Sequence, residues 1–233
     1  NSYSQTEILP DGKILANGTI RNPVLANVTA KFVRMNSDLS LDSSFILPTN
    51  IIISSFAVKD GKIIFFGRVS GNVSFGRLNA DGSLDTLFDS PSAKTGVSLI
   101  KRQLDGKIVI AGDFDQVNNV PRLKVAKLNS DGTIFSEFNP TSGCDTLDLA
   151  VQPDGKVLIC KTLRRLNADG SVDSGFTATP SGDVKKIALQ SDGKILIGGD
   201  FVIVNGVSRI AFARLNSDGS LDTTFNPLFP TGT

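Results

Sequence analysis

The sequence predicts an all-β protein: a β-propeller of about five four-stranded antiparallel blades that forms a single domain over residues 1–233. Three observations predict this fold class. Two phrases recur in step five times, Asp-Gly and Asn-Gly pairs separate β-rich runs, and the middle run of each repeat is apolar almost throughout. The repeat period of 38 to 49 residues is typical of propellers and too long for leucine-rich repeats.

One recurring phrase is Asp-Gly-Lys followed by apolar residues, as in SDGKILIGG at 191–199. The other is a polar turn that ends in phenylalanine, as in LNSDGSLDTTF at 215–225. Together they divide the chain into repeats at approximately 1–46, 47–90, 91–139, 140–179 and 180–233.

The fifth repeat shows the predicted strands in order, at 184–191, 194–204, 207–217 and 220–225. The turns between them contain Asp192-Gly193, Asn205-Gly206 and Asp218-Gly219. Such pairs favour two-residue type I′ turns, in which both central residues have positive φ. Three turns of this kind would join the four strands into a meander.

The second strands, such as KIIFFG at 62–67, do not alternate between apolar and polar residues. A strand reads this way when both faces of its sheet are covered. Each small sheet is therefore expected to lie between two neighbouring sheets, which is the arrangement of a propeller.

A phenylalanine closes every repeat, and we expect it to fill the wedge between adjacent blades: Phe45, Phe88, Phe138, Phe176 and Phe225. An aspartate stands three residues earlier, except in the third repeat, which has Phe135. It is expected to accept hydrogen bonds where the chain bends towards the next blade: Asp42, Asp85, Asp173 and Asp222. Two further sets of basic residues, one before each Asn-x-Asp-Gly turn and one in each Asp-Gly-Lys, are interpreted as a solvent-exposed rim.

The amino-acid composition excludes some classes of function. The chain has no histidine, which excludes Ser-His-Asp and Cys-His catalytic groups, and we expect no metal and no cofactor. A net charge of +1 gives no reason to expect nucleic acid as a partner, and no apolar run is long enough for membrane insertion. Cys144 and Cys160 are interpreted as separate packed thiols, with a disulfide as the alternative; a two-residue turn would place Cys160 opposite Leu149. The start at Asn1 is interpreted as a processed or excised chain.

The combined pattern DGK-I-L-x-G-G-x-F, N-G-x-x-R and A-R-L-N-x-D-G-x-x-D-x-x-F resembles the delta-sixty repeat, a bacterial β-propeller repeat family of unknown function. Repeats 3 and 5 carry it most fully, including Arg122 and Arg209, whereas repeats 2 and 4 are shortened in the middle. The resemblance implies a secreted or surface-attached bacterial protein and brings no activity or ligand. We therefore expect an extracellular or cell-surface location.

The function expected is that of a non-catalytic adhesion or protein-binding module, with a protein or cell-surface partner and, less favoured, carbohydrate. Propellers bind through loops at one end, and the loops between the second and third strands vary most here. Candidate ligand-binding residues on these loops are Arg21, Asn22, Asn27, Asp115, Asn118, Arg122, Asn205 and Arg209. The competing interpretation is that they are ordinary hairpin ends.

Three alternatives remain open on the sequence. In the first, the protein is a structural subunit or spacer that self-associates, and its five repeats either close a ring or form part of a longer array. In the second, it is a glycoside hydrolase that uses Glu7, Asp145, Asp148 or Asp183, the acids on the innermost strands. In the third, its Asn-x-Asp-Gly turns, such as Asn79 to Asp85, bind calcium, although a hairpin explains these turns without metal.

Overall fold

The computed structural model describes residues 2–21, 29–59, 61–88, 96–140 and 148–226, and within these ranges all regular secondary structure is β. Five three-stranded antiparallel sheets follow one another along the chain as blades 1 to 5. Blade 1 contains β1 (Ser2–Ile8), β2 (Ile14–Arg21) and β3 (Thr29–Met35). Blade 2 contains β4 (Ile51–Lys59), β5 (Lys62–Val69) and β6 (Asn72–Leu78).

Blade 3 contains β7 (Val97–Arg102), β8 (Ile108–Gly112) and β11 (Val125–Leu128), with a hairpin of β9 (Gln116–Val117) and β10 (Val120–Pro121). Blade 4 contains β12 (Leu149–Val151), β13 (Val157–Ile159) and β14 (Arg164–Leu166). Blade 5 contains β15 (Val184–Leu189), β16 (Ile195–Gly199) and β19 (Phe212–Leu215), with a hairpin of β17 (Ile203–Val204) and β18 (Val207–Ser208).

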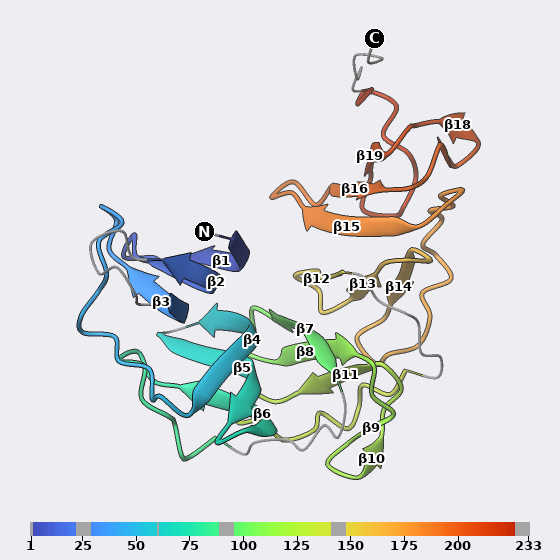
Figure 1. The fold of residues 1–233 in the computed structure, drawn as a ribbon. Coiled ribbons are helices and arrows are strands. Elements are labelled where there is room, and N and C mark those ends of the chain that lie inside the picture. Colours follow the sequence, from blue (N-terminus) through green and yellow to red (C-terminus); the bar gives the residue numbers. More distant parts are fainter. Residues whose placement is uncertain (1, 22–28, 60, 89–95, 141–147, 227–233) are drawn as a thin grey trace.

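The blades are arranged in an arc with the first strand of each blade on its inner side (Figure 1). Blade 1 lies at one end of the arc and blade 5 at the other. Packing between blades joins β3 to β4, β4 to β7, β7 to β12 and β12 to β15. Among the described residues, no strand of blade 5 packs on a strand of blade 1 to a comparable extent. The all-β propeller predicted from the sequence is thus confirmed.

The predicted four-stranded meander is wrong in detail. In blade 5 the second and third predicted strands each break in two, so that β17 and β18 form a separate small sheet. The fourth predicted strand contributes a single bridge, Leu215 to Leu221, and the chain then turns at once, since Phe225 N donates to Asp222 O. Asp222 Oδ1 accepts from Thr224 N, which draws the chain away from a ladder.

The hairpins contain two types of turn. Asn205 and Gly206 have φ of 50° and 78°, as expected for a type I′ turn. At Asp192-Gly193 only the glycine has positive φ, and Gly193 N donates to Gln190 O while Gln190 N donates to Lys194 O. This is a three-residue loop with a glycine bulge, so the type I′ prediction fails for the Asp-Gly-Lys turns.

The hydrophobic core lies between blades. Each blade has a front face towards the preceding blade and a back face towards the following blade. In blade 3, for example, Ile108 and Ile110 on the front face pack against blade 2, while Val109 and Ala111 on the back face pack against blade 4. All four side chains are fully buried, which confirms that the apolar middle strands are covered on both faces.

The one-residue difference in turn length shifts the predicted register in blade 4. Leu149 pairs with Ile159, and Cys160 N donates to Asp148 O, so Cys160 lies opposite Asp148 rather than Leu149. The Cys160 side chain is fully buried in the cluster between blades 4 and 5. Cys144 lies outside the described residues. The predicted alternative of a disulfide between Cys144 and Cys160 therefore lies outside them too.

Candidate functional site

The two sets of basic residues meet at one carboxylate in each of four blades. Lys13 Nζ and Arg34 Nε both lie 2.7 Å from Asp42 Oδ2. The same three residue types meet in three further blades: Lys62, Arg77 and Asp85; Lys156, Arg165 and Asp173; Lys194, Arg214 and Asp222. The arginine side chains are only 9–21% exposed, so the interpretation as a solvent-exposed rim is wrong for them.

The second carboxylate oxygen of each aspartate accepts a backbone N–H two residues further on, from Ser44, Leu87, Gly175 or Thr224. This confirms the expected role of the aspartate at the bend. Each of the arginines also lies over the closing phenylalanine of its repeat, with 4.5–4.9 Å between the guanidinium carbon and the ring centroid. One repeat phrase therefore encodes one compact ionic and aromatic cluster.

These clusters lower the pKa of their aspartates. The hydrogen bond from Lys156 is the largest cause at Asp173 and lowers its pKa to about 2, against desolvation, which raises it. The hydrogen bonds from Lys13 and Lys194 likewise hold the pKa of Asp42 and Asp222 well below the usual range. These carboxylates are committed to the fold as charged acceptors.

Blade 3 departs from this pattern because Phe135 replaces the aspartate. Lys107 Nζ lies 4.8 Å above the Phe135 ring and pairs with Asp105 at 2.7 Å. Lys127, which stands where the other blades have arginine, is only 2% exposed, and burial lowers its pKa. Its ammonium group donates to Gly155 O at 3.1 Å in blade 4.

The ligand-binding residues predicted from the sequence lie at separate places. Asp115, Asn118 and Arg122 belong to the β9–β10 region of blade 3, and Asn205 and Arg209 to the β17–β18 region of blade 5 (Figure 1). Arg21 ends β2. Asn22 and Asn27 lie outside the described residues.

Two of these residues are held by the fold. Arg122 is 7% exposed and donates to Pro121 O at 2.8 Å and Asn139 Oδ1 at 3.3 Å. Asn205 Oδ1 accepts from Thr179 N at 2.7 Å, and its amide donates to Gly219 O at 3.1 Å. Arg122 thus ties its hairpin to Asn139, which follows the closing phenylalanine of blade 3. Asn205 ties its hairpin to the turn at Gly219 in blade 5 and to Thr179 in the linker from blade 4.

The proposed calcium donors are engaged in the same way. Asp81 Oδ1 accepts from Ser83 N and Ser83 Oγ, and Asn79 donates to Ser83 Oγ. Asp85 is the ion-pair partner described above. Within the described ranges, no three His, Cys, Asp or Glu residues are grouped so as to hold a metal ion.

Of the innermost acids, Asp148 is 7% exposed and connects two blades. Its Oδ1 accepts from Leu149 N at 3.0 Å and its Oδ2 from Ile187 N at 3.2 Å. Glu7 is half-buried in blade 1, and desolvation is the main cause that raises its pKa. Asp183 is exposed and lies immediately before β15, and Asp145 lies outside the described residues.

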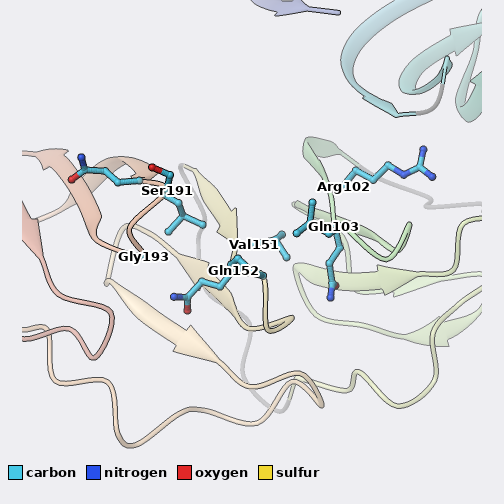
Figure 2. A pocket seen from close by; sticks show the side chains of 10 residues that line it. Arg102, Gln103, Val151, Gln152, Ser191 and Gly193 are labelled. Atoms are coloured by element: carbon cyan, nitrogen blue, oxygen red, sulfur yellow. The ribbon is translucent and has the colours of Figure 1, made fainter. Parts of the chain in front are cut away.

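A different site emerges at the Asp-Gly-Lys end of the inner strands. The last residues of β7, β12 and β15 and the residues that follow them line a cavity of about 310 Å³, which we call the glutamine pocket. Figure 2 shows Arg102 and Gln103 on one side, Val151 and Gln152 in the middle, and Ser191 and Gly193 on the other side. Leu104, Pro153, Leu189 and Gln190 complete the lining.

Gln103, Gln152 and Gln190 occupy the same position in successive repeats, two residues before the aspartate of Asp-Gly-Lys. The Oε1 atom of each is buried and accepts no hydrogen bond from any described residue. An unsatisfied buried acceptor is costly, about 1–3 kcal/mol each, and the three residues that carry these acceptors stand at equivalent places and line one cavity. Gln152 as a whole is only 8% exposed.

Blades 1 and 2 differ at this position. Leu9 and Val58 replace the glutamines and line a second cavity of about 480 Å³, together with Glu7 and Arg34. The carboxamides are thus particular to blades 3 to 5. The sequence carries the signal in QLDGK, QPDGK and QSDGK, but nothing in the sequence alone marks these glutamines as buried or unsatisfied.

The chain belongs to the family described as Domain of unknown function (DUF5122) beta-propeller. The family model matches all five repeats, at residues 9–45, 59–88, 103–134, 152–176 and 190–225. No curated protein matches the sequence. No helix among the described residues is long and apolar enough to cross a membrane.

Solved structures share the fold at low identity. A streptogramin B lyase is 17% identical with a TM-score of 0.54, over 94% of this chain and 67% of that chain. YCF48 bound to D1 peptide is 12% identical with a TM-score of 0.54, over 90% of this chain and 64% of that chain. The gluconolactonase XC5397 from Xanthomonas campestris is 14% identical with a TM-score of 0.50, over 84% of this chain and 69% of that chain.

Proposed function

We propose that this protein is a non-catalytic binding module that holds an extended peptide segment of a partner protein in the glutamine pocket. The observation that carries the proposal is the set of three buried carboxamide oxygens, on Gln103, Gln152 and Gln190, that no described residue satisfies. Backbone N–H groups of a peptide recur along its length and are natural donors to such a series.

The rest of the lining supports a peptide over a sugar. Leu104, Val151, Pro153 and Leu189 provide apolar walls for side chains. None of the described residues that line the pocket is aromatic, so they offer no face on which a sugar ring would stack. A pocket with apolar walls and a few convergent polar groups is typical of a specific binding site.

Two further observations are consistent with this function. One structural neighbour, YCF48, is described as bound to a peptide, which is a property of that protein and an example of what the fold accommodates. The repeat phrase resembles the delta-sixty repeat, which implies a bacterial protein outside the cell or on its surface. We include that location in the proposal.

The absence of catalysis is part of the proposal. Asp148, one of the acids considered for glycoside hydrolysis, already accepts two backbone N–H groups and connects blades 4 and 5. Lys186 Nζ lies 4.0 Å from its Oδ2. These contacts favour a structural role for this carboxylate.

The test is selection from a library of short random linear peptides displayed against the full chain, followed by calorimetry with the peptide that is enriched. Gln152→Leu is expected to weaken binding of that peptide by about tenfold, equivalent to 1.4 kcal/mol, and the triple change at Gln103, Gln152 and Gln190 further. Leu9 and Val58 show that this repeat position accepts apolar residues, so these variants are expected to fold.

Arg209→Gln is the matched control, because it changes a predicted ligand residue on the β17–β18 hairpin without touching the pocket. It is expected to leave the affinity unchanged. If no peptide is enriched, or if Arg209→Gln abolishes binding while the triple glutamine variant binds normally, the pocket is not the binding site and the proposal is wrong.

A further inference from the structure

The second cavity lies between blades 1 and 2, at the end of the blades where their Asp-Gly-Lys turns lie. Its volume of about 480 Å³ is within the range of about 300–1,000 Å³ that is usual for small-molecule sites, and we call it the Glu7 pocket. Leu15 on the back face of blade 1 lines one side, and Val58 and Ile63 of blade 2 line the other. The cavity is therefore part of an interface between two successive blades.

Arg34 lines this pocket, but the fold already engages its guanidinium group. Its Nε atom donates to Asp42 Oδ2 at 2.7 Å. One terminal nitrogen donates to Ala80 O, and the other donates to Ser44 Oγ at 3.1 Å. The positive charge of Arg34 is thus directed at Asp42 and not into the cavity.

Two acidic side chains, Glu7 and Asp11, also line the pocket. Glu7 pairs with Leu15 across the strands, so it lies on the face of blade 1 that is directed at blade 2. It accepts a hydrogen bond from the backbone of Val58, and burial is the largest cause that raises its pKa. Coulomb attraction to Lys101 is the smallest cause and lowers the pKa. Among the described residues, no lysine or arginine forms an ion pair with Glu7 or Asp11.

The charge and shape of the cavity define the chemistry of a ligand. A half-buried carboxylate without an ion-pair partner favours a cation, whose charge offsets the cost of burial. Aromatic cages are the usual sites for quaternary ammonium groups, and none of the described residues that line this pocket is aromatic. A primary ammonium group instead donates charge-assisted hydrogen bonds to a carboxylate. The aliphatic side chains of the lining suit an apolar body: Leu9, Leu15, Val58 and Ile63.

We propose that the Glu7 pocket binds a small aliphatic primary amine, with the ammonium group at Glu7 and the apolar body between Leu15 and Ile63. Asp11 is exposed and adds a second negative charge to the same cavity. The carboxylate is particular to this interface, because the equivalent residues of the other repeats are Phe56, Lys101, Ala150 and Ala188. The glutamine pocket belongs to blades 3 to 5, so the inference does not depend on the proposed function.

The test is calorimetry of the full chain with a panel of linear and cyclic aliphatic primary amines, from hexylamine to adamantylmethylamine. Each amine is compared with the alcohol of the same carbon skeleton. At neutral pH the amine is protonated and the alcohol is uncharged, so each pair isolates the contribution of the charge. At least one amine is expected to bind at least about tenfold more tightly than its alcohol. If no amine binds more tightly than its alcohol, the proposal is wrong.

Glu7→Gln is expected to abolish the preference for the amine, while its amide oxygen remains an acceptor for the backbone of Val58. Glu137→Gln is the matched control, because it makes the same change at the other glutamate of the chain, which is exposed in blade 3. Glu137→Gln is expected to leave the preference unchanged, and so is Gln152→Leu, which alters the glutamine pocket. A preference that survives Glu7→Gln would overturn the proposal.

Hydrogen exchange of the unmodified chain gives a second measurement that does not depend on any variant. A ligand that binds only the folded state stabilises the elements that it contacts. Saturating amine is therefore expected to slow exchange in β1 and β4, which carry Glu7 and Val58, and to leave β12 unchanged. Protection that appears in β12 and not in β1 and β4 would place the amine elsewhere and contradict the proposal.

Discussion

At the residue scale, one aspartate in each of four repeats explains why the phrase recurs. Its carboxylate binds the lysine of Asp-Gly-Lys, the arginine of the third strand and a backbone N–H at the following bend. Asp173 takes Lys156 from the Asp-Gly-Lys turn and Arg165 from β14, and its other oxygen fixes the bend at Gly175. Its side chain is 11% exposed, so these bonds are largely shielded from solvent. Removing any one partner leaves a shielded charge without its complement, which is why the three residue types recur together.

The lowered pKa of these aspartates predicts acid sensitivity. An aspartate in an unfolded chain has a pKa of about 3.9, and Asp173 has a pKa of about 2 in the fold. The carboxylate therefore stabilises the protein above about pH 4, and this stabilisation is lost as the pH falls from about 4 towards 2. Urea midpoints measured from pH 6 to pH 2 are expected to fall in that window.

Asp173→Asn is expected to lower the midpoint at pH 6 and to approach the original protein at pH 2. Asp192→Asn is the control, because among the described residues Asp192 accepts only a local bond, from Lys194 N at 3.0 Å. A midpoint that stays constant down to pH 2 would show that the clusters contribute nothing to stability.

A second prediction at this scale concerns the glutamine pocket. Gln152→Leu removes a buried acceptor that no described residue satisfies, so it is expected to raise the free energy of unfolding by about 1 kcal/mol. Asn205→Gly is the contrasting variant: it keeps the positive φ but removes an amide with partners on both atoms, and is expected to lower stability by about 1 kcal/mol. Chemical unfolding of the two variants measures both. Loss of stability in Gln152→Leu would mean that its oxygen is satisfied in solution.

At the element scale, the sequence predicted what local chemistry determines. Asn205-Gly206 and the continuous apolar run of β8 behave as predicted, because positive φ and two-sided burial each leave a direct mark on the residues used. The Asp-Gly-Lys turns were predicted with the wrong type, since the bulge depends on the bond from Gln190 N to Lys194 O and not on the pair itself. Because the loop has three residues instead of two, Cys160 lies opposite Asp148 and not opposite Leu149 as predicted.

The convergence of the basic residues depends on register, which the phrase does not encode. Lys156 and Arg165 are placed on one carboxylate by the pairing of β13 with β14 and by the turn that follows. The glutamine pocket was missed for a related reason. It is assembled from three blades, and only their spatial arrangement brings Gln103, Gln152 and Gln190 to one cavity.

Phenylalanines at equivalent positions of the repeats are expected to differ in how much each contributes to the free energy of unfolding. Phe138 is fully buried between blades 3 and 4, whereas Phe225 is only partly buried at the end of blade 5. Phe138→Ala is expected to lower the free energy of unfolding by about 3–5 kcal/mol, and Phe225→Ala by about 1 kcal/mol. Urea unfolding compares the two. Equal losses would mean that the back face of blade 5 is covered in the isolated chain.

Two glycines with the same backbone conformation test the interface turns. Gly170 and Gly193 have φ of 89° and 82°, but only at Gly170 would a Cβ meet backbone, at 2.7 Å from Pro140 N. Gly193→Ala is expected to cost about 1–2 kcal/mol for the left-handed conformation alone. Gly170→Ala is expected to cost about 1–3 kcal/mol more, because the adjacent linker must move. Thermal or urea unfolding that ranks them the other way would contradict the tight packing of the Gly170 turn against the linker at Pro140.

At the scale of the whole molecule, an arc of repeats gains its stability from nearest neighbours. Blades 2, 3 and 4 each share apolar clusters with two neighbours, and the described part of blade 5 shares one with blade 4 alone. The ends of such an array are therefore expected to open before its middle. Local unfolding of this kind is measurable as hydrogen exchange that differs between blades.

The final prediction compares Ile110→Ala in blade 3 with Ile197→Ala in blade 5. Both residues are fully buried on the front face of their second strand, so each variant loses about 2–5 kcal/mol of local packing. Blade 3 cannot open without exposing clusters on both sides, so Ile110→Ala is expected to accelerate exchange in β5 and β13 as well as β8. Ile197→Ala is expected to accelerate exchange in β16 and β19 and to leave β5 unchanged, because blade 5 can open and leave the other interfaces intact. Uniform acceleration by both variants would instead show that the five blades unfold as one cooperative unit, because the interfaces between neighbouring blades are strong enough to couple them all.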